Sequence, residues 1–149
     1  MYEFLQKINP PASQDFSVGG RIAWAIYCYE AGKDAWESGD ALRAINMLQE
    51  AIHSFPFPAS LELLGEYLLL EGKPVEATIY LAAAVGMAEE YNFSSVFLLG
   101  KALARANDNY VSKIMLKKAL SIKPDQEAEE LLSEVVNRAA QGDQPHGSL

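Results

Sequence analysis

Small and apolar residues recur along the chain in a fixed frame: a glycine, a small residue twelve positions later, a leucine four beyond that and an alanine three beyond the leucine. Spacings of 33 and 35 residues between successive glycines are typical of helix-turn-helix repeats. The pattern therefore predicts an all-α fold of three stacked helix pairs. The copies are Gly32, Ala44, Leu48 and Ala51; Gly65, Ala77, Leu81 and Ala84; and Gly100, Ser112, Leu116 and Ala119.

Turn and capping residues divide each copy into two helices. In the first copy we expect helices over about residues 21–37 and 40–54, separated by Ser38-Gly39. Asp40 stands at the start of the second helix, where an aspartate side chain accepts a hydrogen bond from a free backbone N–H. Pro56 and Pro58 then close the copy, because proline has no N–H with which to continue a helix.

The second copy is expected to begin near Ser60, to turn at residues 71–73 and to restart at Pro74 in a helix that runs to about residue 90. Proline is favoured in a first helical turn because the N–H it lacks would have no partner there.

The third copy is expected to begin near Ser94 or Ser95, to turn at residues 107–109 and to end at about Ile122. An amphipathic helix follows, with apolar residues at the i, i+3, i+4 and i+7 spacing. The predicted division is an N-terminal segment, residues 1–20, which acts as a cap or as a dimerising arm; a repeat domain, 21–140, with copies over about 25–57, 58–92 and 93–124 and a capping helix over 125–140; and a disordered tail, 141–149.

The small residues of the frame predict close contact between the two helices of each pair. Antiparallel helices approach closely only where the side chains at the crossing are small. Gly32, with Ala44 and Ala51, would supply this crossing in the first pair, and Leu48 would fill the space beside it.

This frame resembles the tetratricopeptide repeat family, which has small residues at these places, a large apolar residue at the leucine and often a proline five residues after the last alanine. Pro56 and Pro124 match that proline, whereas Glu89 replaces it in the second copy. The tryptophan that the family often carries four residues before the glycine is absent. The resemblance covers about residues 25–124 and implies a right-handed superhelix whose first helices line a concave groove.

Each first helix carries a second stripe of residues, opposite its packing face, that the resemblance places in the groove. Aromatic and leucine anchors among mixed charges are typical of a peptide-binding surface. In the alternative interpretation, Trp36, Leu69 and Phe97 pack between adjacent first helices. The candidate peptide-binding residues are Tyr29, Lys33, Trp36 and Glu37; Glu62, Glu66, Leu69 and Leu70; and Phe97, Lys101 and Arg105.

The charges on these stripes indicate the chemistry of the partner. Some family members bind the acidic C-termini of chaperones through lysine, asparagine and arginine on their first helices. Of the corresponding positions here only Lys33 is basic, which disfavours that mode. Glu37, Glu62 and Glu66 instead favour a ligand with apolar anchors and positive charge.

Composition and charge exclude other classes. The chain has 149 residues, 50% of them hydrophobic, enough for one domain with a core. Its net charge is −8, which disfavours nucleic acid and anionic membranes as partners. The single cysteine, Cys28, excludes an internal disulfide and is expected to be buried. We find no signal peptide, and the longest apolar run, 77–88, is too short to span a bilayer. These features predict a cytoplasmic protein.

Catalytic and cofactor motifs are absent from the sequence, which contains no phosphate-binding loop, nucleophile elbow or metal-ligand pattern. We therefore expect no enzyme activity, no metal and no cofactor. The predicted function is that of an adaptor or small co-chaperone that binds a peptide segment of a client protein. The alternative is a structural or assembly subunit that forms a homodimer through its N-terminal segment or its outer surface.

Overall fold

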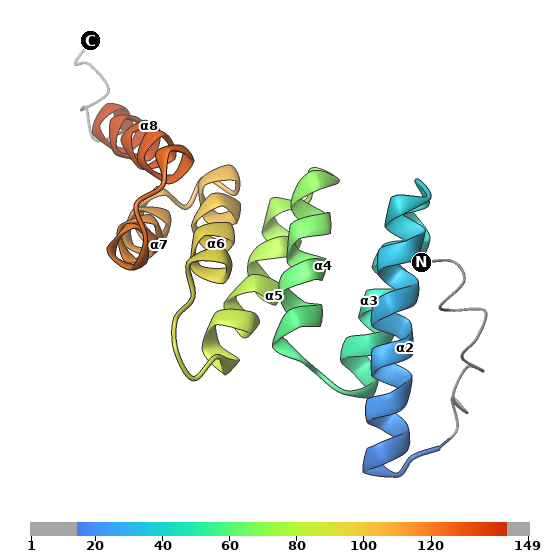
Figure 1. Cartoon of the computed structure of the whole chain (residues 1–149). Coiled ribbons are helices and arrows are strands. Elements are labelled where there is room, and N and C mark those ends of the chain that lie inside the picture. Colours follow the sequence, from blue (N-terminus) through green and yellow to red (C-terminus); the bar gives the residue numbers. More distant parts are fainter. Residues whose placement is uncertain (1–14, 143–149) are drawn as a thin grey trace.

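The helices follow one another in a row, from α2 and α3 at one end to α7 and α8 at the other (Figure 1). The structure is a computed structural model that describes residues 15–142. Within that range it contains no strand. The helices are α2 (Val18–Glu37), α3 (Ala41–Ser54), α4 (Pro58–Leu70), α5 (Pro74–Met87), α6 (Phe93–Arg105), α7 (Asn109–Ile122) and α8 (Gln126–Gly142).

Some helices begin at a residue whose side chain accepts a hydrogen bond from a free backbone N–H group, and others begin at a proline, which has no N–H group. Asp40 accepts a hydrogen bond from the Arg43 backbone N–H at 3.1 Å, which confirms it as the N-cap of α3. Pro74 occupies the start of α5, also as predicted. Pro58, which was expected to close the first copy, is instead the first residue of α4, because proline suits a first helical turn, and Ser60 lies in that turn as predicted.

Two helix boundaries differ from the predictions at the ends of the repeat domain. Helix α2 begins at Val18, so the last residues of the predicted N-terminal segment are helical, and α8 continues to Gly142. Helix α5 ends at Met87 rather than near residue 90, since Ala88 already has an extended backbone. The predictions for residues 1–14 and 143–149 lie outside the described residues.

The turn inside each pair is closed by the same backbone motif. Gly39, Gly72 and Asn107 have φ values of 86°, 74° and 63°, the left-handed conformation that glycine and asparagine tolerate best. In the first pair Gly39 N–H donates to the Trp36 carbonyl at 3.0 Å and Asp40 N–H to the Ala35 carbonyl at 2.9 Å. The equivalent bonds recur in the other two pairs, so each first helix ends in a Schellman turn.

The glycine of each copy lies directly under the leucine of its partner helix. A Cβ atom added to Gly65 would lie 2.3 Å from Cγ of Leu81, and the corresponding distances are 3.0 Å for Gly32 and Leu48 and 3.0 Å for Gly100 and Leu116. The predicted close crossing is confirmed, with the leucine above the glycine rather than beside it.

Two buried clusters form the core. One cluster runs through the five helices from α2 to α6 and includes Leu48, Leu64 and Leu81. The other joins α6, α7 and α8 through Val96, Leu116 and Val135. The contact between α3 and α4 is less extensive than the contacts of α5 with α6 and of α7 with α8. The first and second helix pairs therefore meet at the smallest interface in the row.

From the second helix pair onward, the row is also joined on the side of the first helices. Helix α4 contacts α6, and α6 contacts α8, whereas α2 and α4, like α3, α5 and α7, make no contact of that extent with one another within residues 15–142. We call the side formed by α2, α4 and α6 the inner face, and the opposite side formed by α3, α5 and α7 the outer face.

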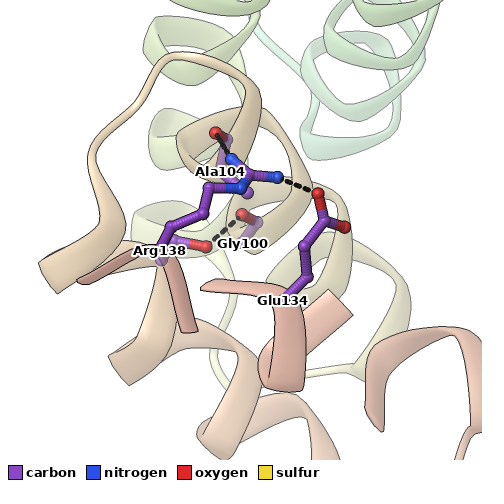
Figure 2. Close-up of polar contacts among 5 residues, drawn as sticks. Gly100, Ala104, Glu134 and Arg138 are labelled. Carbon is purple, nitrogen blue, oxygen red and sulfur yellow. Dashed lines mark hydrogen bonds and ion pairs between the residues drawn. The ribbon is translucent and has the colours of Figure 1, made fainter. Parts of the chain in front are cut away.

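Helix α8 closes the last pair through polar contacts as well as apolar ones. Arg138 donates to the Ala104 carbonyl in the last turn of α6 at 3.1 Å and forms an ion pair with Glu134 (Figure 2). Its positive charge lies where the carbonyl end of a helix is most negative. Ala128 and Val135, the buried residues of α8, pack in the second core cluster.

Candidate peptide-binding groove

The structure divides the predicted groove residues into a solvent-accessible set and a packed set. The side chains of Leu69 and Phe97 are only 4% and 9% exposed, and both lie in core clusters. They pack between helices, as the alternative interpretation has it. The accessible residues, partly or fully exposed, are Tyr29, Lys33, Glu37, Glu62, Glu66, Leu70, Lys101 and Arg105.

Trp36 joins the first pair to the second. Its ring stacks on that of Tyr67 with a centroid distance of 4.0 Å and an interplanar angle of 7°. It is half-buried, so it supports the inner face and still presents an edge to solvent. A stacked aromatic pair at this interface offsets the small contact between α3 and α4.

Two adjacent hollows lie between α2 and α4. The first, the apolar hollow, has a volume of about 300 Å³ and is lined by Ile26, Tyr29, Phe57, Pro58, Ala59 and Ser60. The second, the acidic hollow, has a volume of about 220 Å³ and is lined by Tyr29, Ala59, Glu62, Leu63 and Glu66. Since both include Tyr29 and Ala59, the two hollows adjoin each other, and we call them together the groove.

Most of the apolar lining was missed in the sequence. Ile26 and Ala59 lie three residues before Tyr29 and Glu62, one helical turn toward the start of the same stripes. Extending each stripe by one turn would have found both. Phe57 enters from the link between α3 and α4, whose path the helical periodicity does not predict, and Pro58 is the first residue of α4.

Glu62 is held in place by the next repeat. Its carboxylate oxygens accept hydrogen bonds from Ser94 Oγ at 2.5 Å and from Ser95 Oγ at 2.6 Å. These bonds fix one wall of the acidic hollow and link α4 to α6.

Two carboxylates of the inner face act on the phenol of Tyr67. Burial, followed by the charges of Glu66, Tyr29 and Glu37, raises the pKa of Tyr67 to about 12. Glu66 is exposed and forms no ion pair within the described part of the chain. The ammonium of Lys33 lies over the Tyr29 ring, 5.5 Å from its centroid.

Helix α6, the first helix of the third pair, contributes basic residues to the inner face, and one of them already forms an ion pair. Lys101 forms an ion pair with Glu127 of α8 at 2.7 Å and lies over the Phe97 ring. Arg105 is exposed at the end of α6. The inner face is therefore acidic on α4 and carries its cations mainly on α6.

Residues 15–142 contain a further hollow and a further group of basic side chains outside the inner face. A hollow of about 320 Å³ between the start of α2 and the end of α3 is lined partly by Trp24 and Glu50, which are hydrogen-bonded to each other at 3.0 Å. Lys118 and Lys123 lie over the rings of Tyr91 and Phe93, and no ion pair joins them to α8 in residues 15–142.

Residues 15–142 contain neither a cluster of metal-ligating side chains nor a membrane-spanning helix. No group of histidine, cysteine, aspartate and glutamate there is arranged to hold a metal, and no helix is long and apolar enough to cross a membrane.

Comparison with known proteins gives matches to solved structures. No family model and no curated protein matches the chain. The first TPR domain of the human RPAP3 protein, determined by NMR, superposes with a TM-score of 0.70 at 18% identity, over 82% of this chain and 97% of that one. The first TPR domain of Spaghetti (RPAP3), bound to the HSP90 peptide SRMEEVD, superposes with a TM-score of 0.68 at 19% identity, over 78% and 95%. The resemblance is confirmed at the level of architecture: this chain has the all-α, superhelical fold of a tetratricopeptide repeat domain.

Proposed function

We propose that the chain is a non-catalytic protein–protein interaction module that binds a peptide segment of a client protein along its inner face. The groove between α2 and α4 carries this proposal, because it combines an apolar hollow with fixed charges. Such a combination of anchoring surface and a few polar groups is typical of binding sites. The structural neighbour bound to an HSP90 peptide supports the use of this fold for peptide binding.

In a cell the module would act as an adaptor or small co-chaperone. The inner face is preformed, since Schellman turns, glycine–leucine crossings and the Glu62 bonds hold the first helices without a ligand. A preformed site binds without first ordering its own backbone, which favours affinity. Neither the groove nor the function we propose requires a metal or cofactor.

The proposal is tested by selecting binders from a random displayed peptide library and measuring their affinity for two variants. The groove variant carries alanine at Tyr29, Lys33, Glu66 and Lys101, four residues of the inner face. The control variant carries alanine at Tyr110, Arg43, Glu76 and Lys117, a chemically matched set that is exposed on the outer face.

Selected peptides should bind the wild type and the control variant equally and the groove variant at least about tenfold more weakly, as expected when a central aromatic is truncated. Equal helicity and equal urea midpoints of the three proteins are required before affinities are compared. Loss of binding in the control variant with retention in the groove variant would overturn the proposal.

A second candidate function rests on the outer face. Leu42, Val75 and Tyr110 lie ten residues after the glycine of each copy and are 72%, 64% and 77% exposed. A repeated row of exposed apolar side chains favours an assembly subunit or a homodimer that uses this face. Sedimentation velocity of the wild type and of a variant with serine at these three positions would reveal it, through a dimer that only the wild type forms.

A further inference from the structure

We infer that the groove between α2 and α4 selects an extended segment in which a bulky apolar side chain and a lysine or arginine side chain lie two residues apart. The inference rests on the proposed function and specifies its ligand. It follows from what lines the two hollows, from how the acidic residues are held, and from the distance between the hollows along α4.

The apolar hollow accepts an uncharged side chain. Its lining from Ile26, Tyr29, Phe57, Pro58 and Ala59 presents mainly carbon to the cavity, and its serine is buried. Ile26 is 52% exposed, so a ligand would remove apolar surface from water there. A leucine, isoleucine, methionine or phenylalanine side chain fits this chemistry.

The acidic hollow accepts a cation. Glu62 is held in position by the two serine hydroxyls, and Glu66 lies one helical turn away with no ion pair among the described residues. Two carboxylates on one wall repel each other and attract a positive group placed between them. Lys101 is paired with Glu127, and Lys33 lies over the Tyr29 ring and forms no ion pair with Glu62 or Glu66 among the described residues.

The distance between the hollows sets the spacing in the ligand. On α4 the residues that line the apolar hollow are centred on Ala59, and the two carboxylate residues of the acidic hollow are centred midway between Glu62 and Glu66. Five helical residues separate these points, which at 1.5 Å per residue is roughly 7.5 Å. In an extended chain, side chains on one face repeat every two residues, about 6.7 Å, so an apolar residue and a basic residue at positions i and i+2 reach both hollows.

The same charges act against an acidic ligand. The peptide bound to the structural neighbour, SRMEEVD, contains three carboxylate side chains. Placed in this groove, they would face Glu62 and Glu66, and like charges at such an interface oppose binding. The groove should therefore prefer a basic peptide to this one.

Three peptides of equal length test the inference in titrations of the ¹⁵N-labelled full chain at low salt. GRGLGRG has arginine two residues from leucine on both sides, so its direction in the groove does not matter. GGRLRGG has the same composition, but its arginines point to the opposite face of an extended chain. SRMEEVD is the acidic comparison. GRGLGRG should bind about three- to fivefold more tightly than GGRLRGG, the range of a single exposed ion pair, with the largest shifts at amides of α2 and α4.

Protein variants locate the two contacts. Glu66→Gln should weaken GRGLGRG about three- to fivefold and abolish most of its salt dependence, whereas Glu71→Gln, at an exposed carboxylate at the end of the same helix, should change neither. Ile26→Ala should weaken GRGLGRG but leave GRGAGRG unchanged. Both side chains are accessible, so the fold should be retained, which urea midpoints check.

The outcomes separate the inference from the function it rests on. Equal binding of GRGLGRG, GGRLRGG and SRMEEVD, or tighter binding of SRMEEVD, overturns the inference while peptide binding by the groove stands. Failure of GRGLGRG to bind, when library-selected peptides do bind the groove, also overturns the inference alone. Failure of all these peptides, selected ones included, to shift α2 and α4 overturns both.

Discussion

Substituting alanine for Gly65 places a methyl group where Leu81 already stands. The added Cβ would lie 2.3 Å from Cγ and 2.6 Å from Cδ2 of Leu81, a side chain with no exposed surface. Cγ is the branch point of the leucine rather than its flexible end, so a rotation about the last bond does not remove the overlap. Either the leucine or the helix must move.

The expected free-energy change combines two opposing effects. Overpacking a close contact costs about 1–3 kcal/mol, and this overlap belongs at the upper end of that range. Replacing glycine by alanine inside a helix returns about 1 kcal/mol. The fold should therefore lose about 2 kcal/mol of unfolding free energy with Gly65→Ala. At Gly32 the added atom lies 3.0 Å from Cγ of Leu48, a few tenths of an ångström too close, so Gly32→Ala should be nearly neutral.

Urea unfolding followed by circular dichroism measures these differences. With a slope of about 2 kcal/mol per molar urea, Gly65→Ala should lower the midpoint by about 1 M. Gly86→Ala is the matched control in the same pair, because a Cβ there meets nothing within 4 Å, and it should raise stability by about 0.5 kcal/mol.

A double substitution tests the stated cause. Leu81→Ala alone should cost about 2–5 kcal/mol. Combined with Gly65→Ala it should cost clearly less than the sum, because the overlap is gone. Strict additivity, or a Gly65→Ala protein as stable as the wild type, would refute the argument from packing.

Further expectations concern the turns, the last helix and the buried thiol. Gly72→Ala should destabilise the fold by about 1–2 kcal/mol by urea unfolding, since Gly72 has a φ of 74°, and an unchanged midpoint would contradict this. Arg138→Ala removes the bonds to Ala104 and Glu134 and should lower the free energy of unfolding by about 1 kcal/mol. Relative to the wild type, its amide hydrogen exchange should become faster in α8 by more than it does in α3. Burial, aided by a nearby carboxylate, raises the pKa of the Cys28 thiol from 9.0 to about 12. Its stabilising effect is complete below pH 9 and is lost as pH rises toward 12, so between pH 9 and 10 Cys28→Ala should lose about 1 kcal/mol less stability than the wild type.

Local chemistry made most of the fold predictable. Asp40 and Pro74 act through neighbours a few residues away, so their roles as helix starts can be inferred from the sequence. The glycine–leucine crossing repeats three times and needs only the regular geometry of two helices. The end of α5 at Met87 was missed because no proline or glycine follows it directly. The chain bends there to reach the Asn92 cap of α6.

The site was less predictable because it depends on how neighbouring pairs approach each other. Helical periodicity placed Leu69 and Phe97 on the same stripes as Glu66 and Lys101, but it does not reveal how deeply the next helix covers each position. The bonds of Glu62 to two serines more than thirty residues away are likewise set by the angle between repeats. Only the tertiary structure fixes that angle.

The small contact between α3 and α4 changes what occupancy of the groove would do to the molecule. The two hollows lie across this same joint, with Tyr29 on one side and Glu62 on the other. A ligand that touches both residues would bridge the first helix pair and the rest of the row. It would add its contacts to the Trp36–Tyr67 stack, which already joins the two helix pairs. A bound ligand would thereby stabilise the arrangement of the helix pairs that bind it.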